Sequence, residues 1–254
     1  MVFSGGADSA LVLAGAVRAL GTDAVAAFTV ASASLPTAEL SAARSFAAAL
    51  AVPHHISDTG ELTVGGYRAN GPDRCYFCKT SMLDTAQHLA AVHGYRTIAT
   101  GTNADDLHDP FRPGLMAGAQ HGVRTPLAAA GLSKADVRQL SRQWGLATGD
   151  KPAMPCLASR IAYGVRITPY RLTRIERAEA EVRSRCEPAG LALRDLRVRD
   201  LGHAVRIEVD GPYVDAVRDL PGIDRALATA GFTQDTTITV EPFRSGNLNT
   251  LEQS

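Results

Sequence analysis

Six residues near the start of the chain, SGGADS at positions 4–9, combine two adjacent glycines with hydroxyl and carboxylate side chains. The apolar run at 10–14 follows directly and predicts a helix that begins at this turn. Free backbone N–H groups and the positive end of the helix dipole meet there, and glycines let an anion approach the main chain closely. The spacing therefore predicts a phosphate-binding turn, with a carboxylate placed to hold Mg²⁺, made by Ser4, Gly5, Gly6, Asp8 and Ser9.

This turn differs from two better-known phosphate motifs. No Gly-Lys-Ser/Thr follows it, so it is not a Walker loop, and it lacks the Gly-x-Gly-x-x-Gly spacing of dinucleotide-binding folds. A plainer interpretation stays open, in which Ser4 and Asp8 cap the helix while the glycines only make the turn.

Four cysteines form a second chemical feature. Cys75 and Cys78 stand in a C-x-x-C pair, a spacing that is used by redox pairs and by half of a zinc site. A zinc site would need another ligand such as His108 or His121, and neither lies at a ligand-like spacing from a cysteine. Cys186 falls inside a predicted helix, where a small buried side chain is the simplest interpretation. Cysteine usage therefore favours metal or redox chemistry over structural disulfides.

An α/β fold is predicted for residues 1–150, because short β-type runs alternate with amphipathic helical runs. That alternation is typical of a doubly wound parallel sheet with helices on both faces. Strands are expected at 2–3, 24–30, 54–56 and 97–101, and helices at 8–20, 37–50, 79–93 and 133–144. The first strand is shorter than the usual five or six residues, so we expect the natural start to lie upstream of Met1.

A smaller α+β domain is predicted for residues 151–254, after a loop rich in proline and glycine. Thr168 as N-cap and Pro169 in the first turn predict a helix that runs to about residue 185. Strands are expected at 195–200, 204–209 and 236–240, and helices near 214–218 and 224–230.

Composition argues against several kinds of partner. The 254 residues are 45% hydrophobic, and 26 Lys and Arg balance 26 Asp and Glu, so no net field draws the protein toward nucleic acid or membrane. No apolar run reaches the length that spans a bilayer, and the first residues lack the layout of a signal peptide. The expected compartment is the cytoplasm.

The glycine turn resembles the pyrophosphate-binding loop of the ATP pyrophosphatases, which transfer AMP to a substrate and release pyrophosphate. Further motifs, in the family's order, extend the resemblance over nearly the whole chain to the LarE family of ATP-dependent sulfur transferases, which act in assembly of the nickel-pincer nucleotide cofactor. The motifs are RCYFCK (74–79), GTNADD (101–106), RPG (112–114), RTPL (124–127), KPAMPCLASRIAYG (151–164) and RSGNLN (244–249). The family usually has proline at Ala162 and serine at Asn247.

The resemblance implies an adenine nucleotide alpha hydrolase-like fold and a two-step reaction. ATP with Mg²⁺ activates a carboxylate of a pyridinium-dicarboxylate mononucleotide as an acyl-adenylate, and a sulfur nucleophile then displaces AMP to leave a thiocarboxylate. Cys156 matches the position at which some members surrender their own cysteine sulfur. Other members hold a [4Fe-4S] cluster on three cysteines, here Cys75, Cys78 and Cys156, whose open iron can bind sulfide from a sulfur donor. The presence of all three thiols favours the cluster type.

Further candidates each carry a plainer interpretation. Lys79 could neutralise the ATP phosphates or be a solvated surface lysine. Gly101, at the carboxyl edge of the predicted sheet, could let AMP pass close to the backbone. Asp105 and Asp106 could hold magnesium or cap the next segment. Thr29 could contact adenine or ribose, although its β-propensity explains it nearly as well.

Substrate binding is expected to involve the second domain. Arg206 and Arg244 match family positions implicated in binding the substrate phosphate, a group that arginine binds well. Glu176 could bind metal or substrate, with a salt-bridged surface glutamate as the alternative. The resemblance also implies a homo-oligomer such as a hexamer.

Three rival functions remain open. A tRNA thiolation enzyme shares the phosphate loop and the cysteine-held cluster, but the balanced charge makes a nucleic-acid partner less favoured. A non-enzymatic nucleotide or metal sensor predicts ATP binding without pyrophosphate release. An amide-forming synthetase would need an ammonia source and would leave the cysteines unused.

Overall fold

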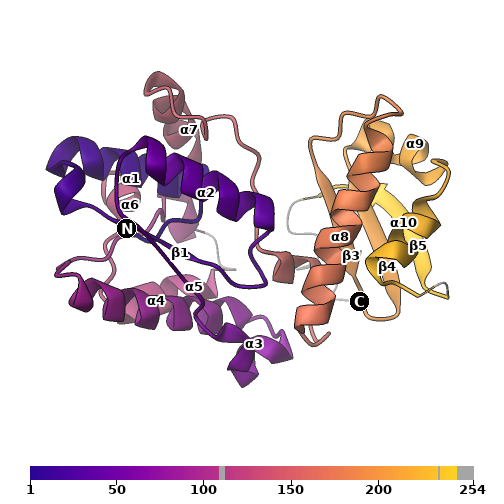
Figure 1. Cartoon of the computed structure of the whole chain (residues 1–254), viewed down its shortest axis with the longest axis horizontal. Coiled ribbons are helices and arrows are strands. Elements are labelled where there is room, and N and C mark those ends of the chain that lie inside the picture. Colours follow the sequence, from indigo (N-terminus) through magenta and orange to yellow (C-terminus); the bar gives the residue numbers. More distant parts are fainter. Residues whose placement is uncertain (109–111, 234, 245–254) are drawn as a thin grey trace. The chain divides into compact units, whose positions relative to one another are not determined.

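The computed structural model describes residues 1–108, 112–233 and 235–244 and divides the chain into two compact units (Figure 1). The first unit comprises Met1–Tyr67 and Pro72–Met154, and the second comprises Arg68–Gly71 and Pro155–Ser254. The sequence-based prediction puts the domain boundary after residue 150, and the two compact units divide after Met154. No sequence pattern predicts that the short segment at 68–71 joins the second unit.

Parallel pairing builds the sheet of the first unit. β1 (Ala27–Val30) pairs in parallel with β2 (His54–Ser57), and Val2 bridges the other side of β1. The Val2 N–H donates to the Ala99 carbonyl at 2.9 Å. The first-strand segment, residues 1–3, therefore makes an isolated bridge to β1 on one side and a hydrogen bond to Ala99 on the other.

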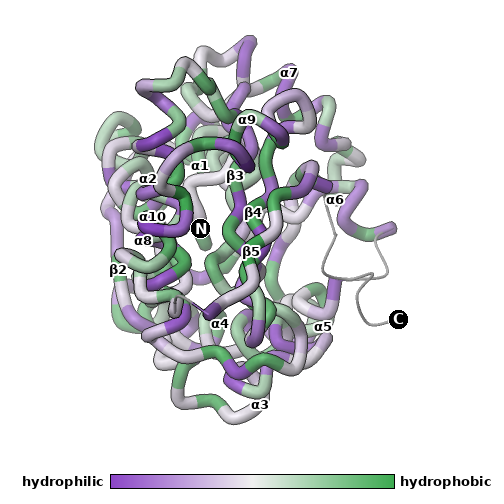
Figure 2. The backbone as a smooth tube through the Cα atoms, turned by 90° about the vertical axis from the view of Figure 1, so that its right-hand side faces the viewer, coloured by the Kyte–Doolittle hydropathy of each residue, from purple (hydrophilic) through white to green (hydrophobic). Residues whose placement is uncertain are grey.

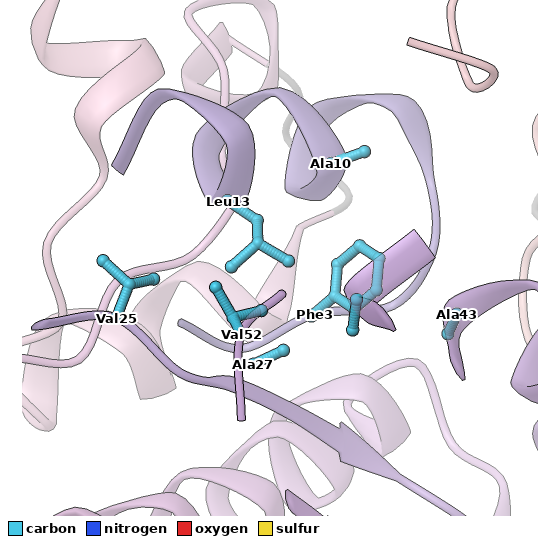
Figure 3. Close-up of a cluster of buried hydrophobic side chains, with 8 residues drawn as sticks. Phe3, Ala10, Leu13, Val25, Ala27, Ala43 and Val52 are labelled. Carbon is cyan, nitrogen blue, oxygen red and sulfur yellow. The ribbon is translucent and has the colours of Figure 1, made fainter. Parts of the chain in front are cut away.

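Helices pack on both faces of this sheet. Successive residues of a strand point to opposite faces, and Phe3 packs with α1 (Ala7–Leu20) and α2 (Thr37–Ala49), whereas Val2 packs with α4 (Arg74–Val92). Figure 3 shows the apolar cluster around Phe3, which contains Ala10, Leu13, Val25, Ala27, Ala43, Ala47 and Val52. The other helical elements of the unit are η1 (Thr22–Ala24), η2 (Glu61–Thr63), η3 (Asp105–His108), α5 (Pro113–Gln120), α6 (Pro126–Ala129) and α7 (Lys134–Gln143). α3 (Gly65–Ala69) begins in this unit, and its last two residues belong to the second.

The second unit is a three-stranded sheet with helices. Its elements in chain order are η4 (Leu157–Arg160), α8 (Pro169–Cys186), β3 (Leu196–Asp200), β4 (Ala204–Val209), η5 (Gly211–Tyr213), α9 (Val214–Arg218), α10 (Ile223–Ala230) and β5 (Thr237–Pro242). β3 and β4 are antiparallel, and β4 and β5 are parallel. Hydrophilic and hydrophobic residues alternate along β3, as the colours of Figure 2 show, and α8 packs against this strand.

Several sequence predictions are confirmed. The first unit has α/β character with parallel strands, Ser133 and Asp136 form a capping box at α7, and Thr168 caps α8. The doubly wound layout as a whole stays a prediction. Several expected elements differ. The strand expected at 24–30 starts only at Ala27, after the η1 turn, and the segments 2–3 and 97–101 form isolated bridges at Val2 and Ala99 in place of regular strands. α4 begins at Arg74, before the predicted start. No helix of the described residues has the length and apolar character needed to cross a membrane.

Candidate functional site

The glycine turn leads from the first strand into α1. Gly5 has a φ of +76°, a left-handed conformation that favours glycine, and Gly6 is the N-cap of α1. The Ser9 hydroxyl donates to the Gly6 carbonyl at 3.0 Å and accepts from the Ser4 N–H at 3.3 Å. No side chain of the described residues caps the start of α1 by a hydrogen bond. Its first N–H groups can therefore bind an anion.

Two residues of the GTNADD segment hold the turn in place. A Cβ on Gly101 would lie 2.6 Å from the Ser9 amide nitrogen, so only glycine fits against the start of α1. Asn103 Nδ2 donates to Asp8 Oδ1 at 2.9 Å, while Asp8 Oδ2 makes no hydrogen bond to a described residue. Gly101 thus lets its own backbone pack closely on the backbone at the start of α1. Asp8 keeps one carboxylate oxygen that could bind Mg²⁺.

The two aspartates of the same segment have protein partners. Asp106 forms ion pairs with Arg112 at 2.7 Å and with Lys134 at 3.3 Å, and it accepts from the Asn103 N–H at 3.3 Å. Asp105 accepts from the Lys134 N–H at 2.9 Å, at the first residue of α7. These contacts favour the capping interpretation of Asp105 and Asp106 over a magnesium site.

A lysine outside the predicted site contacts the turn directly. Lys151 Nζ donates to the Gly5 carbonyl at 3.0 Å and to Glu39 Oε2 at 2.7 Å. Both charged side chains are largely buried, with exposed fractions of 20% for the lysine and 12% for the glutamate. The place of Lys151 at the head of the KPAMPCLASR segment is the sequence signal that could have identified it.

Thr29 supports the strand that enters the turn. Its buried hydroxyl donates to the Phe3 carbonyl at 2.6 Å and accepts from His54 Nε2 at 2.8 Å. Burial, and then the nearby Arg44, lowers the pKa of His54, which favours the neutral form of its ring. A contact of Thr29 with adenine or ribose stays a prediction, and its role in fixing Phe3 is the observed one.

The C-x-x-C pair lies on the first turns of α4, which corrects the expectation that this helix begins after the pair, at residue 79. Cys75 is exposed and Cys78 is half-buried, and their i, i+3 spacing places them on one face. Burial lowers the pKa of Lys79, and an ionised Cys78 would oppose that shift. A Cβ on Gly114 would lie 3.5 Å from the Cys75 carbonyl, so the RPG segment packs closely on this turn.

In the second unit, Cys156 is the exposed N-cap of η4. Its carbonyl accepts from the Ser159 hydroxyl at 2.7 Å and from Arg160 Nη1 at 3.2 Å. Arg160 is fully buried, and its Nε donates to Glu179 Oε1 at 3.0 Å. A buried cation therefore fixes the backbone of the cysteine turn, and Glu179, one turn after the predicted Glu176 on α8, anchors that cation.

Arginines line one face of the strand pair β3–β4. Arg199 lies directly opposite Arg206, and Arg197 lies opposite Glu208. The Arg199 guanidinium donates to Glu208 Oε2 at 2.7 Å and to the Ser159 carbonyl at 2.9 Å. This arginine face, formed by Arg197, Arg199 and Arg206, therefore contacts the Cys156 turn within the unit.

Of the two arginines predicted to bind the substrate phosphate, only Arg206 lies on the arginine face. Arg206 pairs with Glu241 at 3.1 Å, while Arg244 follows β5 as an exposed residue. Arg197 was not predicted; burial, and then the nearby Arg160, lowers its pKa. Residues 245–249 of the RSGNLN motif, Asn247 among them, lie outside the described residues.

The three predicted cluster ligands belong to different units. Cys75 and Cys78 lie in the first and Cys156 lies in the second. Within either unit, the described residues form no group of three or more His, Cys, Asp or Glu that could hold a metal. His121, considered above as a zinc ligand, bonds Asp84 at 3.0 Å, and that bond raises its pKa. The three-cysteine site stays a prediction.

Comparisons with known proteins identify the family. No family model matches the chain. Over 252 residues it is 40% identical to an uncharacterized protein of Synechocystis sp., a match that covers 98% of this chain and 91% of that protein. Over 250 residues it is 31% identical to the pyridinium-3,5-bisthiocarboxylic acid mononucleotide synthase of Lactiplantibacillus plantarum, covering 98% of this chain and 88% of the synthase. Since this identity extends over nearly all of both proteins, the chain belongs to the LarE family.

Proposed function

We propose that the protein is an ATP-dependent sulfur transferase of nickel-pincer cofactor biosynthesis, which adenylates a carboxylate of a pyridinium-dicarboxylate mononucleotide and converts it to a thiocarboxylate. The observation that carries this proposal is the glycine turn, which Gly101 and Lys151 support while the amides at the start of α1 remain open to an anion. The name of the L. plantarum relative, a bisthiocarboxylic acid mononucleotide synthase, points to the same product class.

The first step would take place at this turn, on a sheet that we expect to be doubly wound. The amides of α1 bind the outer phosphates of ATP and orient its α-phosphorus toward a substrate carboxylate oxygen. A bond forms between that oxygen and the α-phosphorus, and the bond from the α-phosphorus to the bridging oxygen breaks, so that pyrophosphate leaves. Mg²⁺, held by Asp8 Oδ2, would neutralise charge on the departing pyrophosphate. Lys79 would add a second positive charge, because a nearby phosphate would favour the protonated lysine and oppose the lowering of its pKa by burial.

The second step would use sulfur at Cys156. A sulfur nucleophile attacks the acyl carbon, and the carbon–oxygen bond to AMP breaks with its electron pair on AMP. If the nucleophile is the Cys156 thiolate, the product is a thioester; loss of the Cα proton and cleavage of the Cβ–Sγ bond then release the thiocarboxylate and leave dehydroalanine. Arg160 and Ser159 hold the carbonyl of Cys156, so the exposed thiol starts from a fixed backbone. Three thiols suit a [4Fe-4S] cluster with an open iron, and such a cluster would supply a carried sulfide in place of the cysteine's own sulfur.

The arginine face would hold the substrate. A mononucleotide has a phosphate that needs a cationic partner, and arginine forks match phosphate geometry. Arg206 is the predicted ligand, and Arg199 connects the same face to the Cys156 turn through Ser159. This connection would keep the substrate phosphate and the thiol in one rigid part of the second unit. Glu176 and Arg244 remain candidates for substrate contacts.

The test is anaerobic purification followed by iron and sulfide analysis and by an assay of pyrophosphate release with the pyridinium substrate. We expect Cys156→Ser to retain substrate-dependent pyrophosphate release and to lose the thiocarboxylate, measured by mass spectrometry. Cys186→Ala is the matched control, because Cys186 is fully buried in α8 and burial raises its pKa. A Cys156→Ser variant that still makes thiocarboxylate would contradict the role of Cys156.

The same assay separates the rival functions. Pyrophosphate release that depends on tRNA instead of the mononucleotide would identify a tRNA thiolation enzyme. ATP binding without release under any of these conditions would identify a sensor.

A further inference from the structure

A short segment of the second unit interrupts the first unit in the sequence. Residues 68–71, which we call the strap, belong to the second unit, although the chain on both sides of the strap belongs to the first. The strap lies against the loop 161–167, which follows η4. Two backbone hydrogen bonds hold it there, from the Gly164 N–H to the Asn70 carbonyl at 3.1 Å and from the Ile167 N–H to the Arg68 carbonyl at 3.0 Å.

The side chain of Asn70 makes further hydrogen bonds to this loop. Its Nδ2 lies 2.8 Å from the Ala162 carbonyl oxygen, 2.9 Å from that of Val165 and 3.3 Å from that of Ile161. Asn70 is fully buried, and its φ of +56° is a left-handed conformation that asparagine adopts more readily than most residues. Because a buried carbonyl that loses its donor is costly, this loop depends on the amide at position 70.

The residues that Asn70 binds continue directly from the cysteine turn. The N–H of Ile161 donates to the Ala158 carbonyl at 3.1 Å, within the η4 turn that Cys156 caps. The next N–H, of residue 162, donates to the Asp200 carbonyl on β3 at 2.9 Å. The strap amide therefore binds the two residues that connect the cysteine turn to the sheet of the second unit.

The chain before the strap is held as well. Tyr67, three residues before Asn70, is buried in the first unit, and its hydroxyl forms a hydrogen bond with the Ser34 hydroxyl at 2.5 Å. Ser34 also donates to the buried carboxylate of Glu61 at 3.4 Å. A donor can fix a loop only when it is itself fixed, and the strap is fixed at this end and by its own bonds to the loop 161–167.

We propose that Asn70 is a positioning residue for sulfur transfer, an inference that rests on the proposed function. By binding the loop 161–167, Asn70 fixes the backbone that presents the Cys156 thiol. The phosphate turn is built from other elements, so adenylation should not need this amide. A displaced thiol would leave the acyl-adenylate to react with water, which breaks the same carbon–oxygen bond and returns the original carboxylate and AMP. Loss of the amide should therefore uncouple pyrophosphate release from thiocarboxylate formation.

The test compares Asn70→Gly with the original chain in the assay of pyrophosphate release and thiocarboxylate formation. Glycine keeps the left-handed backbone and removes the side-chain amide. We expect pyrophosphate release at saturating pyridinium substrate to stay within about twofold, and thiocarboxylate formed per pyrophosphate to fall about tenfold, because buried carbonyls lose their donor. Amide exchange should become faster at Ala162 and Gly164 and stay unchanged across β4.

Two further variants separate positioning from a general loss of stability. Gly164→Ala strains the loop from the other side of its contact with the strap, because Gly164 has a φ of +77° and open space around it. It should lower the thiocarboxylate formed per pyrophosphate about threefold. Ala51→Gly is the matched control, since Ala51 also has a left-handed φ, of +53°, and follows α2 in the first unit. It should leave this ratio unchanged.

Three outcomes would contradict the proposal in different ways. An unchanged ratio of thiocarboxylate to pyrophosphate in Asn70→Gly and Gly164→Ala would overturn the inference while the proposed function stands. A parallel loss of both products, together with faster exchange across β4, would show that Asn70 is purely structural. An original chain that releases no pyrophosphate with the pyridinium substrate would overturn the proposed function, and this inference with it.

Discussion

The phosphate turn of the first unit and the cysteine turn of the second are held in place by different forces. Close packing and one lysine side chain shape the phosphate turn: Gly101 packs on the Ser9 backbone, and Lys151 Nζ donates to the Gly5 carbonyl. Buried charge shapes the cysteine turn, where Arg160 binds the Cys156 carbonyl. The first arrangement depends on shape, whereas the second depends on keeping a desolvated ion pair intact.

This difference fits the proposed chemistry. A phosphate that arrives at the turn supplies its own negative charge, so open amides are sufficient to receive it. A cysteine that attacks a carbonyl carbon must be held by its backbone while its thiol remains accessible. The two turns should therefore respond differently to substitution.

Loss of the buried cation should have the largest effect. Arg160→Met keeps most of the volume but removes the buried cation that pairs with Glu179, which should lower the free energy of unfolding by about 3–5 kcal/mol. Amide exchange across β3 and α8 measures the loss locally, since a chain of two units need not unfold in one step. Arg218→Met is the matched control, because Arg218 pairs with Asp215 at an exposed i, i+3 site in the same unit. Equal effects of the two substitutions would refute the argument from buried charge.

The amino group of Met1 should make the first unit pH-dependent. Its pKa is about 6 in the folded chain and near 8.0 when exposed, so the unfolded chain binds more protons between these values. Stability is then fully present above pH 8 and falls as the pH drops to 6, by at most about 2.7 kcal/mol. Urea unfolding at pH 6 and pH 8 measures this difference. Acetylation of the amino terminus should remove it, and a slope that persists after acetylation would assign it to other groups.

Steric crowding should disrupt the phosphate turn without any change of charge. In Gly101→Ala, a methyl group 2.6 Å from the Ser9 amide nitrogen must displace the start of α1. We expect a cost of about 2 kcal/mol, seen as roughly a thirty-fold weaker ATP affinity by calorimetry. Gly118→Ala in α5 meets nothing within 4 Å and should leave ATP affinity unchanged. Normal ATP binding by Gly101→Ala would show that the contact is dispensable.

Sequence patterns succeeded where local chemistry decides the structure. Ser133 with Asp136 and Thr168 with Pro169 mark the starts of α7 and α8, because caps act within a few residues. The glycine at 101 was also identified, although as a neighbour of AMP. The structure shows that the backbone of α1 occupies the space next to it.

Sequence patterns failed where distant packing decides. α4 starts at Arg74, before the predicted residue, and the ring of Phe77 in its first turns packs on Gly66, where a Cβ would lie only 2.3 Å from the ring. No local signal marks that start, since Asp73 makes no side-chain cap. Arg160 was missed for a similar reason: a buried arginine and a solvated one look alike until the fold supplies Glu179.

Lys151 should show the smallest of these effects, and it tests the comparison between the two turns directly. Its buried charge both binds the Gly5 carbonyl and pairs with Glu39. In Lys151→Met the Gly5 carbonyl loses its donor and Glu39 loses its partner, which should weaken ATP binding about tenfold, or about 1.4 kcal/mol. Glu39→Gln keeps an acceptor for the lysine and should cost less. If the double variant binds ATP as weakly as Lys151→Met alone, the glutamate acts only through the lysine. Additive losses would instead mean that Glu39 supports the turn independently, and that buried charge shapes the first unit as well as the second.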